Sequence, residues 1–535
     1  MRIYVIILLF LAGFNGKAQD KQCLRLFSDR DFYTSGETIL VKVFAPADEQ
    51  SGIVHVDLLN SKGKIISGIN KKISDHQADG YIYLTDSLKT GTYLLAVSNR
   101  INPNITFKEL FVCNRFTGLA EPATVLASSG VAPFNDKQVP VLMEGLEKNY
   151  NTRSTAKMTL RLAPEMLSQV KDNLMVSVAE TTRGVNSVTF SKVLRAKNSQ
   201  MVEKEGVVLD GYLKDLASGA PFNNGCVFLS VPDSVPVLQY FFTGEDGRFH
   251  FQLNDYHGRI PVVVQGFDPA KKRLLKIIPD RRDSLTDCLP IFEVKSVPDE
   301  IQKGVKNAMD ATTLRKIFGF QEVVVPLSLA QKESDYPFFG VPTETVRPSL
   351  FLDLPDFTEI SRELLLGVKF RAYNRIPTMQ IFNSATQNYF NDPPLVLLNG
   401  IPVQDLNVIK GMGSKDIDRI EICRRERFYG DLAFPGVVAI YSSKQVNKFL
   451  PESDELIKLN LDAIQTEGSL NLPKEHVQNE PDLRKVLLWQ PGIKPTETIT
   501  LDFETSDIKG NYKVIVRGIT RDGEVIYNEQ FFEVN

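Results

Sequence analysis

The sequence predicts a multidomain, mainly β protein in which small β-sandwiches follow one another and one α+β unit lies near residue 400. Two observations predict this class. Short β-rich runs, separated by glycine-containing turns, recur along the chain as they do in sandwiches. The 535 residues suffice for about three to five domains, and hydrophobic residues make up 43% of them, enough for several cores.

Residues 1–18 have the pattern of a signal peptide. Arg2 supplies a basic start, an apolar run follows, and Gly16 and Ala18 stand where a signal peptidase requires small residues. We therefore expect cleavage before Gln19 and an exported protein, in the periplasm or on the cell surface and peripheral to the outer membrane. The alternative is that this run forms a buried N-terminal strand. No later segment is a long uninterrupted apolar run, so no transmembrane helix is expected.

Composition and motifs argue against several classes of function. The formal charge of −3 shows no excess of basic residues of the kind that nucleic-acid-binding proteins have. The chain has no Gly-x-Ser-x-Gly elbow, P-loop or dinucleotide-binding fingerprint. None of the five histidines is paired with another at the spacing of a helical metal site. We therefore expect no enzymatic activity, no metal and no cofactor.

Residues 19–115 are predicted to form the first sandwich. β-rich runs such as Thr38–Phe44 and Thr92–Val97 alternate there with turns such as Ser35-Gly36. A small, polar linker follows. Residues 133–200 then repeat the same alternation and are predicted to form a second sandwich.

Both segments resemble the macroglobulin domains of the α2-macroglobulin-like family. In the first, Tyr33, Gly36 and Glu37 match a turn that leads into a strand, and Gly91-Thr92-Tyr93 matches the opening of a late strand. In the second, Asn173 opens a matching strand. The resemblance implies an immunoglobulin-like or macroglobulin-like sandwich for each segment. The family's Gly-Cys-Gly-Glu-Gln thioester motif does not occur, so protease trapping by that chemistry is not expected.

Residues 205–295 are predicted to form a third sandwich. The turn Glu245-Asp246-Gly247 precedes Phe249 and Phe251, which alternate with polar residues as in a hairpin strand. With Gly211-Tyr212, these residues resemble the carboxypeptidase regulatory-like domain, a transthyretin-like sandwich at the front of many Bacteroidetes receptors. The resemblance implies no peptidase chemistry.

Residues 296–349 are predicted to be a helix followed by a connector. Ile301, Val305, Met309 and Leu314 are loosely spaced for one helical face. The remainder of the segment is rich in proline and aromatic residues, which indicates an irregular connector.

Residues 350–445 are predicted to form the α+β unit. Pro394–Leu398 is an apolar, β-rich run that ends at the turn Asn399-Gly400. Ile420 and Ile422 alternate with charged residues, the pattern of a half-buried strand.

Four ordered pieces of this unit resemble the plug domain of TonB-dependent outer-membrane receptors, especially the SusC-like receptors of Bacteroidetes. They are PLVLLNGIPV (394–403), DIDRIEI (416–422), Tyr429-Gly430 and GVVAIYSS (436–443). In such a receptor the plug fills a barrel of about 22 strands. The residues that follow Ser443 are too few to form that barrel. The resemblance therefore implies a plug-like unit without a barrel of its own.

The end of the chain is predicted to be a linker and a last sandwich. Residues 446–482 are charged and poor in aromatic residues, as in a linker. Residues 483–535 carry alternating strand patterns and are predicted to form a separate C-terminal β-sandwich. The lone Trp489 is expected in its core because a tryptophan side chain has a large apolar area.

The five cysteines lie too far apart in the sequence for a short-loop zinc site. Disulfides can form in an exported protein. Cys23 and Cys113 fall near the two ends of the first sandwich, and Cys226 and Cys288 bracket the third, so either pair could bond. The alternative is that all four are buried thiols. Cys423 would remain unpaired.

The plug resemblance leads to an expectation of function. We expect a non-catalytic envelope scaffold, or an accessory subunit that docks on an outer-membrane β-barrel protein in assembly, export or uptake. Arg424, Arg425 and Arg427 follow a predicted strand and are candidate partner contacts; the alternative is a solvated loop. A ligand- or carbohydrate-binding protein, or a hydrolase with a cryptic site, is the other class considered. The single tryptophan weakens a sugar-binding platform.

Overall fold

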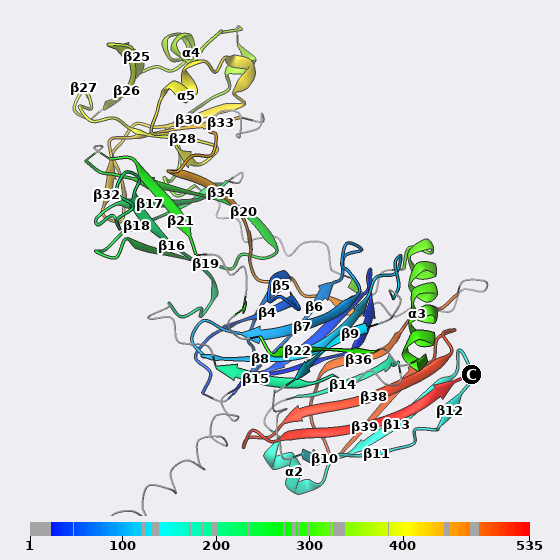
Figure 1. The fold of residues 1–535 in the computed structure, drawn as a ribbon. Helices are drawn as coiled ribbons and strands as arrows, with labels where there is room; N and C mark the ends of the chain where they lie inside the picture. Colours follow the sequence, from blue (N-terminus) through cyan, green and yellow to red (C-terminus); the bar gives the residue numbers. More distant parts are fainter. Residues whose placement is uncertain are drawn as a thin grey trace, which may run out of the picture. The chain divides into compact units, whose positions relative to one another are not determined.

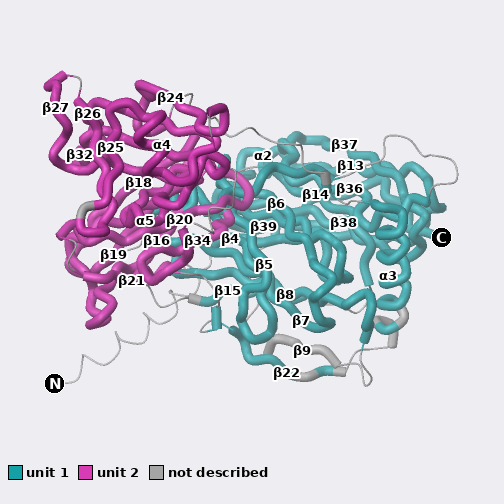
Figure 2. The backbone as a smooth tube through the Cα atoms, turned by 90° about the horizontal axis from the view of Figure 1, so that it is seen from above, with its two compact units in different colours: residues 1–207, 282–329, 463–535 teal, residues 208–281, 330–462 magenta. Residues whose placement is uncertain are grey.

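The computed structural model describes residues 23–46, 48–119, 124–129, 138–170, 173–182, 187–193, 201–232, 235–270, 273–280, 285–286, 289–296, 299–320, 323–324, 337–351, 353–383, 385–442, 450–470 and 481–535. The predicted signal peptide lies outside these residues. The chain divides into two compact units, which Figure 2 colours separately. Unit 1 contains Met1–Val207, Arg282–Leu329 and Ala463–Asn535, and unit 2 contains Val208–Arg281 and Ala330–Asp462.

The first sandwich of unit 1 follows the predicted range closely. One sheet has the order β1 (Arg25–Ser28), β3 (Thr38–Phe44) and β6 (Gln77–Tyr83). The other has the order β15 (Thr189–Val193), β8 (Asn104–Cys113), β7 (Gly91–Ser98), β4 (Ile53–Asn60) and β5 (Ile65–Lys72), and β2 (Phe32–Thr34) pairs with β8 in parallel. Alternating apolar residues from both sheets, such as Val41, Val56 and Leu95, meet in one core.

The second sandwich of unit 1 is built from two distant parts of the sequence. Its larger sheet has the order β10 (Gln138–Pro140), β39 (Val525–Val534), β38 (Gly510–Ile519), β14 (Leu174–Glu180) and β36 (Val486–Ile493), with β12 (Asn149–Tyr150) beside β39. Its smaller sheet contains β11 (Leu142–Glu144), β13 (Thr155–Arg161) and β37 (Thr498–Glu504). A short helix, α2 (Pro164–Gln169), follows β13. Figure 1 shows the red C-terminal strands within this sandwich.

This arrangement corrects the predicted division into a sandwich at 133–200 and a separate one at 483–535. β14 is flanked on both sides by C-terminal strands, β36 and β38. Met158 and Leu160 of β13 share one core with Phe503 and Val514, so neither segment would cover its apolar face alone. β15, predicted within the second sandwich, instead adds an edge strand to the first.

Helix α3 (Asp299–Ile317) confirms the helix expected in residues 296–349 and packs on the first sandwich. Val305 and Ala308 contact Phe32 and Phe111 in a small apolar cluster. Two further strand pairs complete unit 1: β9 (Thr124–Ser129) with β22 (Ile291–Ser296), and β23 (Val323–Val324) with β35 (Ser469–Leu470).

Unit 2 begins with the third sandwich. One sheet has the order β19 (Arg248–Asn254), β16 (Gly206–Asp215) and β21 (Leu275–Pro279). The other has the order β18 (Val237–Phe242), β17 (Cys226–Val231), β20 (Arg259–Phe267) and β34 (Leu456–Asp462). β34 lies in the range predicted as a linker, 446–482. It pairs with β20 over its whole length and brings Leu456 into a core, so the linker prediction was wrong for these residues.

The α+β unit forms the rest of unit 2. Its main sheet has the order β24 (Glu344–Val346), β30 (Arg419–Cys423), β33 (Val437–Tyr441), β28 (Leu395–Leu398) and β29 (Ile401–Pro402), with β28 and β33 parallel. A second sheet contains β25 (Val368–Tyr373), β26 (Ile376–Asn383) and β27 (Asn388–Tyr389), and β31 (Arg427–Tyr429) pairs with β32 (Leu432–Phe434). Helices α4 (Phe357–Glu363) and α5 (Asn407–Lys410), and the 3₁₀ turns Pro348–Leu350 and Ser414–Asp416, complete it.

The core of the α+β unit explains why the strand patterns could be read from the sequence. Ile420 and Ile422 are fully buried, as their alternation with charged residues predicts. Asp356 caps α4 by accepting a hydrogen bond from the Glu359 backbone N–H at 3.0 Å. The predicted fold class, serial immunoglobulin-like or macroglobulin-like sandwiches with an α+β unit, is confirmed by these pairings.

Candidate functional site

The loop that follows β30 carries the three arginines predicted as partner contacts. Arg424 forms an ion pair with Glu344 of β24 and its side chain is only 16% exposed. Its backbone N–H donates to Thr343 Oγ1 at 3.2 Å. Arg424 therefore fastens the end of β30 to its neighbouring strand, and of the three arginines Arg425 is the exposed one.

Arg427 and Phe428 lie at the start of β31, next to an exposed valine. The Arg427 guanidinium donates to the Val341 carbonyl at 3.4 Å. Phe428 is 73% exposed and Val341 is 58% exposed. Arg427 therefore draws the segment that precedes β24 against the loop and leaves two apolar side chains facing solvent.

A third exposed apolar side chain, Leu366, lies beside the same loop. It is 78% exposed and precedes Gly367, where a Cβ atom would collide with the Arg424 guanidinium. We define the arginine-loop surface as Val341, Leu366, Arg425 and Phe428. Exposed apolar side chains beside an arginine-bearing loop are a composition also found at interaction sites.

The arginine loop is also fastened to the third sandwich. The Tyr429 hydroxyl donates to the Leu238 carbonyl, and its ring lies 5.7 Å from the ring of Tyr240. The Tyr240 hydroxyl accepts from the Asp431 backbone N–H at 2.8 Å. Tyr429 and Tyr240 thus hold the α+β unit against the sandwich within unit 2.

Gly430 allows this junction to form. Its φ of +57° favours glycine, and a Cβ atom there would overlap the Tyr240 hydroxyl. The pair Tyr429-Gly430, which the sequence links to the plug resemblance, therefore serves here as the contact between two domains of unit 2.

Sequence reasoning found the arginine loop but missed its apolar neighbours. Val341 and Leu366 are distant in sequence from the arginine loop, so only the fold brings them beside it. The available signal was weak: an apolar residue beside a turn glycine, in Leu366-Gly367 and Gly340-Val341. That Arg425 contacts a partner stays a prediction.

Unit 1 contains a buried ionic cluster centred on Glu37, the glutamate of the macroglobulin-like turn. The Lys485 ammonium lies 2.6 Å from Glu37 Oε1, and both side chains are 1% exposed. Arg30 lies 3.4 Å from Oε2, and Arg315 of α3 lies 3.7 Å from Oε1. Thr312 donates to Oε1 at 2.7 Å. Glu37 thereby joins the first sandwich, α3 and the second sandwich.

The cations of this cluster keep Glu37 ionised. Burial alone would raise the pKa of Glu37, but the nearby Lys485, Arg30 and Arg315 together lower it well below its usual value. The Thr34 backbone N–H also donates to its carboxylate at 2.9 Å. A charged group so enclosed serves to hold elements together, because breaking one partner of a buried pair is costly.

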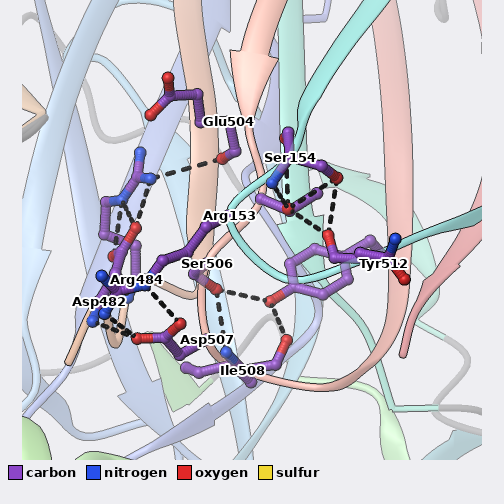
Figure 3. Close-up of polar contacts among 11 residues, drawn as sticks. Arg153, Ser154, Asp482, Arg484, Glu504, Ser506, Asp507, Ile508 and Tyr512 are labelled. Atoms are coloured by element: carbon purple, nitrogen blue, oxygen red, sulfur yellow. Dashed lines mark hydrogen bonds and ion pairs between the residues drawn. The ribbon is translucent and has the colours of Figure 1, made fainter. Parts of the chain in front are cut away.

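A second polar cluster braces the second sandwich (Figure 3). Arg153 donates to both carboxylate oxygens of Asp507, at 2.7 and 2.6 Å, and Asp507 also accepts from the Asp482 backbone N–H at 2.8 Å. Arg484 binds Asp482 through two nitrogens and donates to the Glu504 carbonyl at 3.4 Å. Both aspartates are thus occupied by arginines and are not arranged as a general acid and base.

Tyr512 closes this cluster from the strand β38. Its hydroxyl donates to the Ile508 carbonyl at 2.9 Å and lies 3.0 Å from Ser506 Oγ, as Figure 3 shows. Burial raises the pKa of Tyr512 far above its usual value. Tyr93 in the first sandwich makes the same contact four residues back, donating to the Lys89 carbonyl at 2.8 Å. These tyrosines hold loops at strand ends, as tyrosine corners do.

The structure does not form the first of the two proposed disulfides. Cys23 and Cys113 are both buried thiols. Cys226 is likewise a buried thiol, and its proposed partner Cys288 lies outside the described residues. Cys423 is buried under the arginine loop, and its Sγ lies 3.7 Å from the Val341 carbonyl oxygen. Two cysteines at the ends of one sandwich need not have their sulfurs within bonding distance, because a disulfide requires a specific geometry.

The described part of the chain gathers no three His, Cys, Asp or Glu side chains in a group suited to a metal ion. Of the helices that the structure describes, none has both the length and the apolar content to span a bilayer.

No protein-family model and no curated protein matches the chain. Among solved structures, trypsin-activated alpha-2-macroglobulin from Escherichia coli is similar at 9% identity and a TM-score of 0.22, over 96% of this chain and 41% of that chain. Alpha-2-macroglobulin from Salmonella, reacted with methylamine, is similar at 9% identity and a TM-score of 0.22, over 96% and 39%. Dimeric latent PorU from Porphyromonas gingivalis is similar at 8% identity and a TM-score of 0.15, over 48% and 33%. The chain thus spans about two fifths of the length of the two macroglobulins.

Proposed function

We propose that the protein is a non-catalytic scaffold of the cell envelope that docks on an outer-membrane β-barrel protein through the arginine-loop surface. The observation that carries this proposal is that Val341, Leu366 and Phe428, each more than half exposed, lie on or beside the loop that carries the exposed Arg425. Burying such side chains against a partner is favourable, and aromatic residues with arginine commonly dominate interfaces.

The anchoring of this surface supports a docking role. Arg424 forms an ion pair with Glu344, and Arg427 donates to the Val341 carbonyl. Tyr429 binds the third sandwich. Arg425 and Phe428 therefore project from a braced loop. A braced surface loses little conformational entropy on binding, which favours affinity.

The plug resemblance suggests the class of partner. A receptor plug complements the wall of a barrel, so a barrel protein is the partner that a plug-like unit would fit. The main sheet of the α+β unit ends at β24 and β29, two strands of only three and two residues. Short edge strands resist indiscriminate strand pairing, so loop contacts are the better route to a partner.

The alternative of a hydrolase with a cryptic site gains no support from the clusters described above. Asp482 and Asp507 are bound by arginines, and Glu37 is enclosed by three cations. A glycosidase would need two carboxyl groups facing a sugar across an open site.

The test is co-purification of the tagged full-length chain from detergent-solubilised outer membranes of its native host. The variant combines Arg425→Glu with Phe428→Ser. Both positions are exposed, so stability should change by less than about 1 kcal/mol. We expect recovery of an integral barrel protein to fall about tenfold or more, as for hot-spot residues.

The matched control combines Arg371→Glu with Ile376→Ser, which are exposed on the β25–β26 hairpin of the same unit. This control should recover the barrel protein at the wild-type level. Equal recovery with both double variants would show that docking does not use the arginine-loop surface. Absence of any barrel protein from wild-type preparations would contradict the proposed function itself.

A further inference from the structure

A pocket of about 280 Å³ lies between helix α3 and the strand β6 of the first sandwich, entirely within unit 1. Figure 1 shows α3 beside the strands of this unit. The lining of the pocket includes Tyr81, Tyr83, Thr312, Arg315, Lys316 and Phe320. The volume is below the usual range for drug-sized ligands, about 300–1,000 Å³, so the pocket suits a small molecule or a single side chain.

The pocket combines aromatic walls with a polar floor. Tyr81 and Tyr83 come from β6, and Phe320 follows α3. Thr312 and Arg315 form part of the lining although they are only 1% and 4% exposed. Aromatic walls and a few converging polar groups are the usual composition of a ligand site.

Lys316 contributes a positive charge to the lining of the pocket. Its ammonium donates to the Tyr83 hydroxyl at 3.2 Å and lies 4.9 Å from the Tyr83 ring centre. The neighbouring carboxylate, Asp86, is already bound by Arg115 at 2.8 and 2.9 Å. Arg115 and, less strongly, Lys316 lower the pKa of Asp86, so two cations act on this one carboxylate.

The Glu37 carboxylate beneath the pocket is not available to a cationic ligand. Glu37 Oε1 faces Lys485 and Thr312, and Oε2 faces Arg30 and the Thr34 backbone N–H. Its charge is thus balanced from inside the protein. Both charged side chains in the described lining, Arg315 and Lys316, are cations.

We propose that this pocket binds a small organic carboxylate with an aromatic body. The ring would lie among Tyr81, Tyr83 and Phe320, where offset or edge-to-face contacts between rings are favourable. The carboxylate would accept a charge-assisted hydrogen bond from Lys316. Two sources carry this chemistry: a free aromatic acid, or the C-terminal residue of a chain that ends in phenylalanine.

The test measures calorimetric binding of three probes to the mature full-length chain. They are 3-phenylpropionate, its neutral amide, and an acetylated tripeptide that ends in phenylalanine with a free carboxylate. We expect at least one carboxylate probe to bind, the amide to bind about fivefold or more weakly than 3-phenylpropionate, and added salt to weaken carboxylate binding. Binding of 3-phenylpropionate identifies a free acid as a sufficient ligand. Binding of the tripeptide alone identifies a chain terminus.

The test variant is Lys316→Gln, with Lys306→Gln as the matched control because Lys306 is an exposed lysine elsewhere on α3. Lys316→Gln should weaken binding of the carboxylate probe about fivefold and remove the preference of the pocket for the acid over the amide. Lys306→Gln should change neither the affinity nor the preference. A second variant, Tyr83→Leu, should weaken both the acid and the amide because it removes one aromatic wall.

Three results would overturn this proposal: no binding of either carboxylate probe to the wild type, an amide that binds as tightly as 3-phenylpropionate when the acid does bind, or an unchanged affinity of the bound carboxylate probe in Lys316→Gln. None of them bears on docking through the arginine-loop surface, which lies in unit 2.

Discussion

Glu37 is the residue on which the largest buried ionic cluster described in unit 1 depends. It contacts Lys485 from the C-terminal part of the chain, Arg30 beside it in the first sandwich, and Arg315 from α3. Sequence reasoning identified Glu37 through its turn motif. It could not identify Lys485, because no local pattern links two charges at opposite ends of a chain.

We predict that Glu37→Gln destabilises unit 1 by about 3–5 kcal/mol, because it leaves buried cations without their carboxylate. The lone Trp489 lies in unit 1, so its fluorescence during urea unfolding reports on this unit. Glu144→Gln, which breaks the exposed pair with Arg161, should change stability by less than about 1 kcal/mol. Similar losses from both variants would contradict the role given to Glu37.

The comparison of wild type with Glu37→Gln also predicts how the free energy of unfolding depends on pH. The pKa of Glu37 is lowered in the folded state, so its contribution to stability is fully present above the unfolded value of about 4.3. This contribution is lost as the pH falls through the lower folded pKa. The stability difference between wild type and Glu37→Gln should therefore be constant from pH 7 to about pH 5 and shrink in more acidic solution. A difference that instead shrank as the pH rose above 5 would have the wrong sign.

The buried thiols predict slow alkylation of the native protein. Burial raises the pKa of Cys226 to about 12, and it also raises the pKa values of Cys113 and Cys423. Little thiolate therefore exists at neutral pH, and iodoacetamide reacts with the thiolate. We expect mass spectrometry to find these three cysteines unmodified in native protein and alkylated after unfolding. A bond from any of them to another cysteine, found without reducing agent, would contradict the structure.

At the scale of elements, the C-terminal strands complete a sandwich that begins far upstream. β14 lies between β36 and β38, and β13 pairs with β37. The alternation within each strand was readable from the sequence, and so were the strands themselves. Their partners were not readable, because pairing between distant strands depends on the whole chain rather than on local pattern.

A truncated chain distinguishes the shared second sandwich from a separate C-terminal sandwich. We predict that a chain ending at residue 480 loses the second sandwich, because β14 would lose both neighbours and Met158 would lose its cover from Phe503. Limited proteolysis should then cut within Thr155–Arg161 early in the digest, whereas the intact chain should resist there. Protection of that strand in the truncated chain would support a separate C-terminal domain instead. The control variant Asn535→Ser should leave the proteolysis pattern of the intact chain unchanged.

At the scale of the whole molecule, the chain passes between its two units four times along the sequence. β34 returns to the third sandwich after the α+β unit, so that unit is an insertion in a sandwich fold. Sequence patterns placed the α+β unit and the first sandwich, but they could not show an insertion, which changes no local periodicity. The α+β unit thus leaves and re-enters the third sandwich within unit 2.

Site-specific photo-crosslinking in the native envelope tests the central proposal most directly. A photoreactive phenylalanine analogue replaces Phe428 in the full-length chain, and the same analogue at Ile376 is the control. We predict that position 428 crosslinks to one integral outer-membrane β-barrel protein, identified by mass spectrometry, and that position 376 gives a much weaker product. Fractionation of the wild-type chain away from all barrel proteins, or equal crosslinking from both positions, would contradict docking through the arginine-loop surface.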